Sequence, residues 1–326
     1  MFSTLIVFIL GFCSNVAQAQ QAGKTFRIGY LDVSSASGSA VFVDAFLQEL
    51  SRLGWVEGKN IAIEYRFAEG KPGPTSELAA DLVRMKVDLI VATGMPPALA
   101  AKRATTVIPI VMVTVGDPVG GGLVASLARP GGNGTGLSSL VPELNSKRLE
   151  VLHDVIPKLV RVGFLRPQGR GGVAGDPSMK EIRPAALGLK IKLEEIEAQA
   201  DAKGLESAFH SAMQKQVNAI MVTAGRSFFG QRKRIVELAG KYRLPAIYPE
   251  KGFVDEGGLM SYGTDNTDLY RRAAVYVDKI LKGAKPADLP VQQATKFEFV
   301  INLKAAKQID LTIPNRVLER ANQVLK

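Results

Sequence analysis

The sequence predicts an α/β protein with two Rossmann-like lobes, each built on a parallel sheet, joined by a hinge. Two apolar runs, residues 87–92 and 108–115, are rich in β-branched residues and do not alternate with polar ones. Such runs are typical of strands that helices bury on both faces of a parallel sheet. Strand and helix patterns alternate along the chain, and roughly ten predicted strands exceed what one doubly wound sheet usually holds.

The first lobe begins near residue 25. Short apolar or alternating runs that end at Gly, Pro or Asp predict strands at residues 26–31, 60–67, 87–92, 108–115 and 135–140. Amphipathic runs predict helices at residues 41–53, 75–85, 97–106 and 123–128. Gly54 ends the first helix, and Pro97 opens the third at a position where a missing N–H costs nothing.

The alternation starts again after a helix at residues 143–156, which Pro157 ends. Strands follow at residues 161–165, 190–195, 219–223, 246–248, 258–262 and 297–302. Helices are predicted at residues 177–187, 202–215, 227–242, 268–281 and at the C-terminus. We assign residues 25–138 and 263–290 to lobe 1, and residues 139–262 and 291–326 to lobe 2. Two lobes joined in this way can close around a ligand by a hinge motion.

The N-terminus has the pattern of a secretory signal peptide. An apolar run at residues 2–12 is too short to span a bilayer and is followed by Ala17-Gln18-Ala19. We expect residues 1–19 to be a signal peptide that is cleaved after Ala19. No Lys or Arg precedes the apolar run, which leaves open a true start upstream. The one cysteine, Cys13, lies in this segment, so the mature chain has no disulfide and no cysteine metal site.

Composition excludes some classes of partner. With 46% hydrophobic and 22% charged residues, the chain has the composition of a soluble globular protein. The net charge is +10, but the charges are scattered and no basic run has interleaved aromatic residues. Nucleic acid is therefore not an expected partner.

Catalytic motifs are scarce. The two histidines lie on predicted helices without a nearby Ser–Asp pair, and neither G-x-S-x-G nor H-E-x-x-H occurs. We expect no metal and no cofactor. The loop of residues 169–174, from Gly169 to Ala174, does fit G-x-G-x-x-A, which leaves an NAD(P)-dependent oxidoreductase as an alternative. Three residues separate its first glycine from the preceding strand, however, and such enzymes usually work where the cofactor pool is.

A small-molecule site is expected beyond the carboxyl ends of the strands, where ligands bind in open α/β sheets. Hydroxyls beside helix N-termini suit a carboxylate, arginines can pair with an anionic group, and aromatic rings can cover an apolar body. The predicted ligand-binding residues are Ser34, Ser35, Ser37, Thr93, Gly94, Met95, Gly116, Asp117, Arg166, Gln168, Thr223, Arg226, Phe228, Tyr248 and Asp265.

Several runs occur together across the predicted mature chain and carry a family resemblance. They are RIGYL (27–31), LGWVEGKNI (53–61), PALAAK (97–102), VGDPV (115–119), SLARPGGN (126–133), GGLMSYG (257–263) and TKFEFVINLK (295–304). With these runs the chain resembles the exported substrate-binding proteins of ABC transporters, in the branch that includes tryptophan- and tyrosine-type binding proteins.

The resemblance implies a type I periplasmic-binding-protein fold, a periplasmic and monomeric protein, and delivery of a small ligand to a permease in the inner membrane. The chain departs from the family pattern at Met95-Pro96, where members often have Thr-Pro, and at Leu165-Arg166-Pro167, where they often have Trp-Asn-Pro. The added arginine hints at an anionic ligand, such as an amino-acid-like or aromatic carboxylate. A ligand sensor for a signalling partner stays an alternative to transport.

Overall fold

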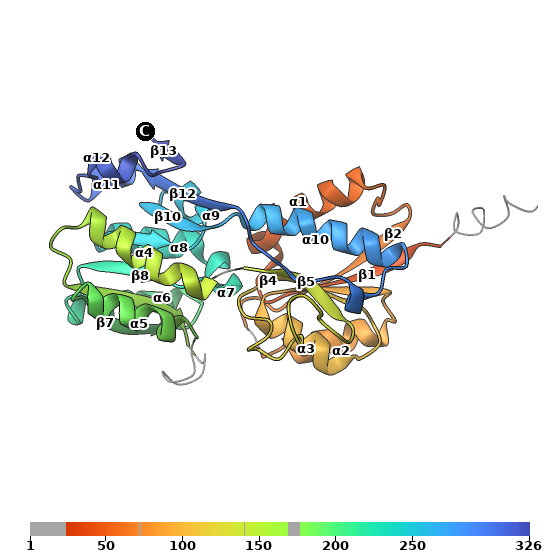
Figure 1. Cartoon of the computed structure of the whole chain (residues 1–326). Coiled ribbons are helices and arrows are strands. Elements are labelled where there is room, and N and C mark those ends of the chain that lie inside the picture. The colour runs from red at the N-terminus through yellow and green to blue at the C-terminus, as the bar shows by residue number, and fades with distance from the viewer. Residues whose placement is uncertain (1–23, 72, 140, 169–176) are drawn as a thin grey trace, which may run out of the picture.

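The computed structural model describes residues 24–71, 73–139, 141–168 and 177–326. They form two lobes, each a sheet with helices on both faces (Figure 1). The prediction of an α/β protein with two mostly parallel sheets is confirmed. The predicted signal peptide, residues 1–19, lies outside the described residues.

The first sheet is parallel throughout and has the order β11-β5-β4-β3-β1-β2. Its strands are β1 (Phe26–Asp32), β2 (Ile61–Phe67), β3 (Leu89–Thr93), β4 (Ile110–Val115), β5 (Gly134–Ser138) and β11 (Gln292–Gln293). On one face, α1 (Ala36–Arg52) packs beside α10 (Asn266–Leu281), and on the other α2 (Thr75–Arg84) packs beside α3 (Met95–Ala104) (Figure 1).

The second sheet has the order β13-β12-β10-β9-β8-β6-β7, and β12 is antiparallel to β10. Its strands are β6 (Arg161–Pro167), β7 (Lys192–Ala198), β8 (Ala219–Val222), β9 (Ala246–Tyr248), β10 (Met260–Thr264), β12 (Phe297–Asn302) and β13 (Gln323–Leu325). Its helices are α4 (Val141–Val155), α5 (Pro177–Gly188), α6 (Ala202–Gln214), α7 (Arg226–Gly230), α8 (Arg232–Lys241), α9 (Lys251–Asp255), α11 (Leu303–Gln308) and α12 (Asn315–Leu318).

The central strands are buried on both faces, which explains their unbroken apolar sequences. Successive side chains of a strand point to opposite faces of the sheet. In β3, Leu89 and Val91 join the core under α1 and α10, whereas Ile90 and Ala92 join the core under α2 and α3. The second sheet repeats this division, so each lobe has a helix layer on both sides of its strands.

The chain passes between the lobes three times, between β5 and α4, between β10 and α10, and between β11 and β12. The crossing segments are bonded to one another, from Ala294 N to Ser138 O at 2.8 Å and from Asp265 N to Lys296 O at 3.0 Å. The later crossings fall a few residues beyond the predicted positions 263 and 290. Residues up to Thr264 still pair with β12 in the second sheet, and β11 adds a short strand to the first sheet.

Some predicted elements differ from the structure. The helix predicted at residues 123–128 is wrong, because this segment folds as turns in which Leu123 N donates to Pro118 O at 2.8 Å. The helix predicted at residues 227–242 is two helices, α7 and α8, which meet at Gln231. The short strands β11 and β13 were not predicted, because two or three residues show no periodicity.

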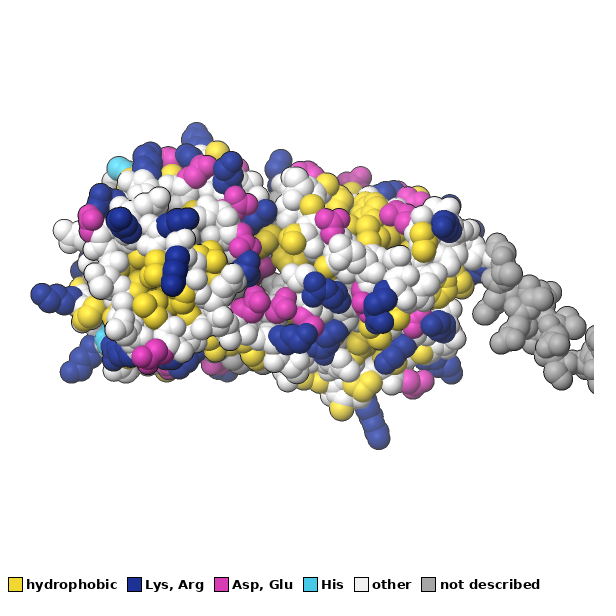
Figure 2. Space-filling view, turned by 90° about the horizontal axis from the view of Figure 1, so that it is seen from above, with side chains coloured by type: hydrophobic (Ala, Val, Ile, Leu, Met, Phe, Trp, Pro, Cys, Tyr) yellow, Lys and Arg dark blue, Asp and Glu magenta, His cyan; other side chains and the backbone are white. Residues whose placement is uncertain are grey.

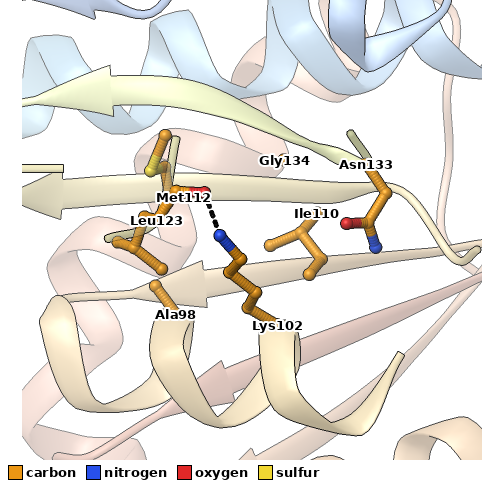
Figure 3. A pocket seen from close by; sticks show the side chains of 7 residues that line it. All are labelled: Ala98, Lys102, Ile110, Met112, Leu123, Asn133 and Gly134. Carbon is orange, nitrogen blue, oxygen red and sulfur yellow. Dashed lines mark hydrogen bonds between the residues drawn. The ribbon is translucent and has the colours of Figure 1, made fainter. Parts of the chain in front are cut away.

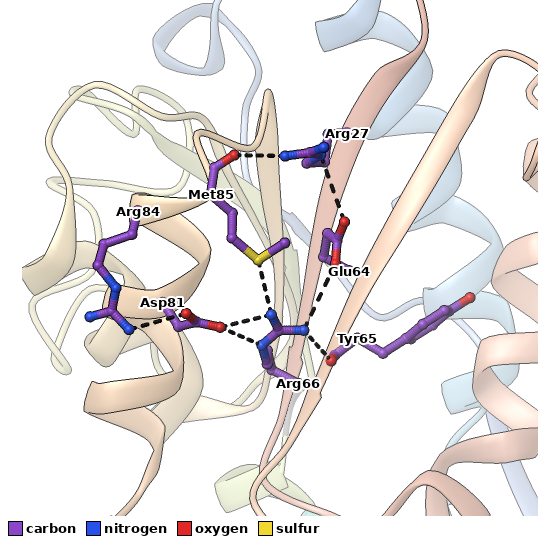
Figure 4. A network of polar contacts seen from close by, with 7 residues as sticks. All are labelled: Arg27, Glu64, Tyr65, Arg66, Asp81, Arg84 and Met85. Atoms are coloured by element: carbon purple, nitrogen blue, oxygen red, sulfur yellow. Dashed lines mark hydrogen bonds and ion pairs between the residues drawn. The ribbon is translucent and has the colours of Figure 1, made fainter.

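A network of hydrogen bonds and ion pairs at the edge of lobe 1 connects β2 to α2 (Figure 4). Arg66 of β2 donates from Nε to Asp81 Oδ2 at 2.7 Å, and Arg84 contacts the other Asp81 oxygen at 3.1 Å. The hydrogen bond from Arg66 lowers the pKa of Asp81 below its ordinary value. Arg27 donates to Met85 O at 3.0 Å from the start of β1, at the opposite end from the strand ends where a ligand is expected.

Candidate functional site

The carboxyl ends of strands from both sheets meet where the lobes touch. Helix α1 follows β1 in lobe 1, and α7 follows β8 in lobe 2. A Cβ atom on Gly38 of α1 would lie 3.0 Å from the Cα atom of Gly230 at the end of α7. Glycine at both positions allows this close approach of the backbones. The loops that follow β1, β3 and β8 therefore face one another across a closed junction.

Arg226 is the side chain that crosses this junction. It belongs to α7, but its Nη2 donates to Ser39 Oγ of α1 at 3.2 Å and its Nε lies 3.8 Å from Asp32 Oδ2. The residue is 6% exposed, so the charge is almost completely removed from water. Burial alone would lower the pKa of Arg226, but the opposing influence of Tyr270 and Asp32 prevails and raises it above the ordinary value.

Aromatic rings surround the Arg226 guanidinium. Its central carbon lies 4.3 Å from the ring centroid of Phe42, 5.0 Å from that of Phe229 and 6.0 Å from that of Tyr270. The Phe42 ring stacks on Tyr270 with a centroid separation of 4.9 Å. A cation this close to ring faces is attracted to them, by about 2 kcal/mol where the site is desolvated.

Asp32 supplies the negative charge on the lobe 1 side. It is completely buried at the end of β1, where Oδ1 accepts from Ser34 N at 2.9 Å and Oδ2 accepts from Ser39 Oγ at 2.6 Å. One bond comes from the turn before α1 and the other from the first turns of α1, so the local fold of lobe 1 orients the carboxylate.

Several buried polar atoms around the junction make no hydrogen bond within the described residues. They are Ser34 Oγ, Thr223 Oγ1, Arg226 Nε, Arg226 Nη1 and Glu250 Oε2. Buried polar atoms are normally paired, and leaving one unpaired costs about 1–3 kcal/mol. Their concentration here is typical of a site where a polar ligand completes the hydrogen bonding.

A second pair of buried charges lies in lobe 2, with Glu250 after β9 and Arg148 on α4. Arg148 donates from Nε to Tyr262 O at 2.6 Å and from Nη1 to Asn145 Oδ1 at 2.7 Å. Burial lowers the pKa of Arg148 to about 10. Burial raises the pKa of Glu250, against the opposing influence of Arg226 and Arg148. Glu250 therefore lies within electrostatic reach of both arginines.

The sequence profile of the family described as ABC transporter substrate binding protein matches residues 32–325. The chain belongs to this family. The match includes both lobes, so the closed junction described above lies between the two lobes of a substrate-binding protein, and we call it the interlobe cleft.

Individual relatives agree with this assignment. A tyrosine-binding protein of Clostridioides difficile (strain R20291) is 29% identical over 266 residues, which cover 82% of this chain and 75% of that protein. A conserved domain protein of Vibrio cholerae has a TM-score of 0.83 at 29% identity, over 92% of this chain and 100% of that one. An ABC domain from Streptococcus pneumonia in complex with L-Trp has a TM-score of 0.79 at 27% identity, over 91% and 100%.

The arrangement of the lobes can be compared with an open form. The ligand-free, open structure of a substrate-binding protein from Clostridium difficile has a TM-score of 0.64 at 25% identity, over 93% of this chain and 100% of that one. The present chain therefore superposes better on the L-Trp complex than on the open form, although its sequence identity to the two is similar. The difference agrees with the close contact of α1 and α7.

The alternative of an oxidoreductase has no support from the family or from these relatives, which are binding proteins. The loop of residues 169–174 lies outside the described residues. Within the described ranges, no group of three or more His, Cys, Asp or Glu side chains is arranged to hold a metal ion. In the same ranges, no helix is both long enough and apolar enough to cross a membrane.

Five of the predicted binding residues lie at or just after the ends of β1, β3 and β8, which border the interlobe cleft. They are Ser34, Thr93, Gly94, Thr223 and Arg226. Gly94 begins α3 with a φ of 85°, a left-handed conformation that favours glycine, and a Cβ atom there would lie 3.6 Å from Arg226 Cγ. The Arg226 side chain therefore runs over Gly94 on its way to Asp32.

Other predicted residues have local structural partners. Ser35 caps the N-terminus of α1, and Asp265 caps that of α10. Asp117 is an exposed turn residue whose Oδ1 accepts from Gly120 N at 2.8 Å. Ser37 and Gln168 are exposed, while Met95 and Gly116 are partly buried. Phe228 and Tyr248 are buried core residues, and Tyr248 stacks on Phe253 at 4.9 Å. Arg166 forms ion pairs with Glu195 and Glu197 of β7.

Some residues at the cleft were not among the predicted binding residues. They are Tyr30, Asp32, Ser39, Phe42, Phe229, Glu250 and Tyr270. Tyr30, Phe42 and Tyr270 lie at core-facing positions of β1, α1 and α10, where a sequence pattern cannot separate a cleft ring from a core ring. Of these residues, Asp32 carries a recognisable pattern, because it is a charged residue at the carboxyl end of a buried strand.

A separate pocket lies within lobe 1, between α3 and β4 (Figure 3). Its walls include Ala98, Met112 and Leu123, and Lys102 spans it. The Lys102 amino group already donates to Gly122 O at 2.7 Å and to Leu123 O at 3.1 Å. The one charged group among the residues that line the pocket is thus already hydrogen-bonded to backbone carbonyls, and the pocket offers a ligand mainly apolar contact.

Proposed function

We propose that this protein is the binding component of an ABC importer and that it holds a small anionic ligand in the interlobe cleft. The observation that carries the proposal is Arg226, a buried cation whose Nε and Nη1 make no hydrogen bond within the described residues. Each of these guanidinium N–H groups can donate a charge-assisted hydrogen bond to a carboxylate oxygen, which is stronger than a bond between neutral groups. Ser34 and Thr223 add hydroxyl donors from opposite lobes.

The surroundings of Arg226 support a ligand with an apolar or aromatic body. Phe42, Phe229 and Tyr270 present rings around the guanidinium, and Glu250 provides a buried acceptor. The relatives named for tyrosine and solved with L-Trp support the same class. The proposed ligand is therefore an amino-acid-like or aromatic carboxylate, bound without a cofactor.

Export and partners belong to the same proposal. The apolar run before Ala17-Gln18-Ala19 supports cleavage after Ala19 and a periplasmic location. The family supports a cognate permease in the inner membrane, and we propose a monomeric binding protein. Charged side chains of both signs are interspersed over the face in Figure 2, which supports a small-molecule rather than a nucleic-acid partner.

The test is a thermal-shift screen in which each aromatic acid or amino acid is paired with the amide that lacks its carboxylate. A ligand that binds only the folded protein raises the melting temperature. We expect at least one acid to raise it while its amide does not. Arg226→Met should weaken that acid at least roughly tenfold in calorimetric titration, since a charge-assisted hydrogen bond contributes about 1.5–3 kcal/mol.

Arg232→Met is the matched control. Arg232 also stacks on Phe229, at 4.7 Å, but it pairs with Glu256 outside the group of unpaired polar atoms. Its substitution should leave the affinity within about twofold. Equal binding of acid and amide, or an Arg226→Met variant with parental affinity, would contradict the proposed anionic site.

A further inference from the structure

Arg226 makes its closest contacts with the lobe to which it does not belong. Its backbone is in α7 of lobe 2, whereas its hydrogen bond to Ser39, its ion pair with Asp32 and its 4.3 Å stacking on Phe42 all reach lobe 1. Extended side chains lose rotamer freedom when they are buried, so such a placement must be stabilised by the receiving surface.

The receiving surface has the chemistry of a cation-binding cage. We define the cage by Asp32, Ser39, Phe42 and Tyr270, all in lobe 1. Phe42 and Tyr270 are stacked at an interplanar angle of 24° and lie on the two neighbouring helices α1 and α10. Asp32 is fixed by two hydrogen bonds that do not involve Arg226. The cage therefore owes its geometry to lobe 1 and does not depend on the arginine that fills it.

We propose that Arg226 is a latch: its guanidinium fills the lobe 1 cage and holds the two lobes closed before any ligand binds. The proposal rests on the proposed function only in taking this cleft as the ligand site. It adds that one half of the cleft is selective for a planar cation, and that the chain supplies this cation itself.

The contacts around the latch fit a closed state of this kind. Gly38 and Gly230 allow α1 and α7 to touch, and the arginine stem passes Gly94, where an added Cβ atom would lie at an ordinary contact distance of 3.6 Å from Arg226 Cγ. A ligand can shift a two-state equilibrium only by its different affinities for the two states. A latch that raises the closed population therefore raises the apparent affinity for any ligand that binds the closed form.

The test measures the distance between the lobes without ligand. Spin labels are placed at Val107→Cys in lobe 1 and Leu187→Cys in lobe 2, in a chain with Cys13→Ser; both sites are more than 80% exposed. Double electron–electron resonance should give one dominant distance between the two labels in the parent, that of the closed form. With Arg226→Ala, a second, open population should appear, and the closed-to-open ratio should fall at least roughly tenfold, as expected for a desolvated cation–π contact.

Chemical rescue separates the cage from a general packing effect. Ethylguanidinium at millimolar concentration should restore the closed distance of Arg226→Ala, whereas equal concentrations of urea or sodium chloride should not. Arg232→Ala, which removes a guanidinium outside the cage, should keep the parental distances. Phe42→Leu keeps the arginine but removes one ring of the cage, and it should open the lobes less than Arg226→Ala.

Three outcomes would overturn the latch: parental distances in Arg226→Ala and Phe42→Leu, no rescue by ethylguanidinium, or equal rescue by urea. The readout needs no ligand, so it is independent of the acid-and-amide screen. If Arg226→Ala opens the lobes but the protein binds acids and amides equally, only the proposed function is contradicted. If the protein binds acids selectively but Arg226→Ala leaves the lobes closed, only the latch is contradicted.

Discussion

Two buried arginines of lobe 2 differ in how they use their donors. Arg148 gives Nε and Nη1 to Tyr262 O and Asn145 Oδ1 and lies beside the strand that leads into the second crossing. Among the described residues, Arg226 makes one hydrogen bond, to Ser39, pairs with Asp32 at 3.8 Å and otherwise contacts aromatic faces. Burial lowers the pKa of Arg148, whereas Tyr270 and Asp32 offset the effect of burial at Arg226 and its pKa is raised.

The contrast shows that burial alone does not identify a functional charge. A guanidinium whose donors are taken by backbone and amide oxygens stabilises one fixed arrangement of the chain. A guanidinium with unpaired donors, held by rings and one carboxylate, can change partners when a ligand arrives. We therefore expect substitutions of Arg148 to act on folding and substitutions of Arg226 to act on binding.

The largest expected effect is on stability, from Arg148→Met. The substitution leaves Tyr262 O and Asn145 Oδ1 unpaired and removes a positive charge near Glu250, which together should cost about 3 kcal/mol of unfolding free energy. Arg226→Met should cost less, about 2 kcal/mol, because it removes one hydrogen bond and the contacts with the rings while Asp32 keeps its bonds from Ser34 and Ser39. Urea unfolding measures both values.

Arg320→Ala is the control for the loss of a positive charge. Its side chain is 40% exposed and pairs with Asp154 at 2.6 Å, a surface ion pair worth about 0–1 kcal/mol. If Arg226→Met lost more stability than Arg148→Met, the division between a structural and a binding arginine would be wrong.

A smaller effect is expected from Glu250→Gln, and it depends on pH. Burial raises the pKa of Glu250, so its ionised form is less favourable in the folded than in the unfolded protein. The folded protein therefore loses stability as pH rises through the pKa that Glu250 has in the folded state. Below the ordinary pKa of 4.5, the carboxyl is protonated in both states and this loss is absent. Glutamine has no such transition.

Relative to the parent, Glu250→Gln should gain stability at pH 7 and show no gain at pH 4. Melting temperatures across this range measure the difference, and Glu237→Gln, on the exposed end of an ion pair with Arg234, is the control. A gain that is equal at both pH values would mean that the carboxylate at 250 is not desolvated in the folded protein.

The sequence predicts much of this fold because each strand and helix has a local pattern. The buried strands β3 and β4 are apolar except for Thr93 and Thr114, and α2 ends where its periodicity ends. Elements that depend on distant partners were beyond such reasoning. β11 is a strand only because Gln292 meets Leu137, and the segment at residues 123–128 is turned by Pro118 and Pro130.

The candidate site was predictable in part for the same reason. Arg226 and Thr223 follow a buried strand, which is where ligands of parallel sheets bind. Phe42 and Tyr270 become part of the cleft only because α10 returns to lobe 1 beside α1 and α7 closes over them. No pattern within α1 distinguishes Phe42 from Phe46, which is also buried.

The smallest expected effect concerns Asp117, a predicted binding residue whose structural partner is a turn. Its Oδ1 accepts from Gly120 N and its side chain is exposed, in contrast to the buried hydroxyls of Ser34 and Thr223. Asp117→Ala should cost less than about 1 kcal/mol of unfolding free energy and leave ligand affinity unchanged. Ser34→Ala, the matched substitution in the cleft, should weaken the ligand several-fold with as small an effect on unfolding. A loss of affinity in Asp117→Ala equal to that in Ser34→Ala would extend the cleft to the end of β4, and the separation of cleft residues from turn residues would have to be redrawn.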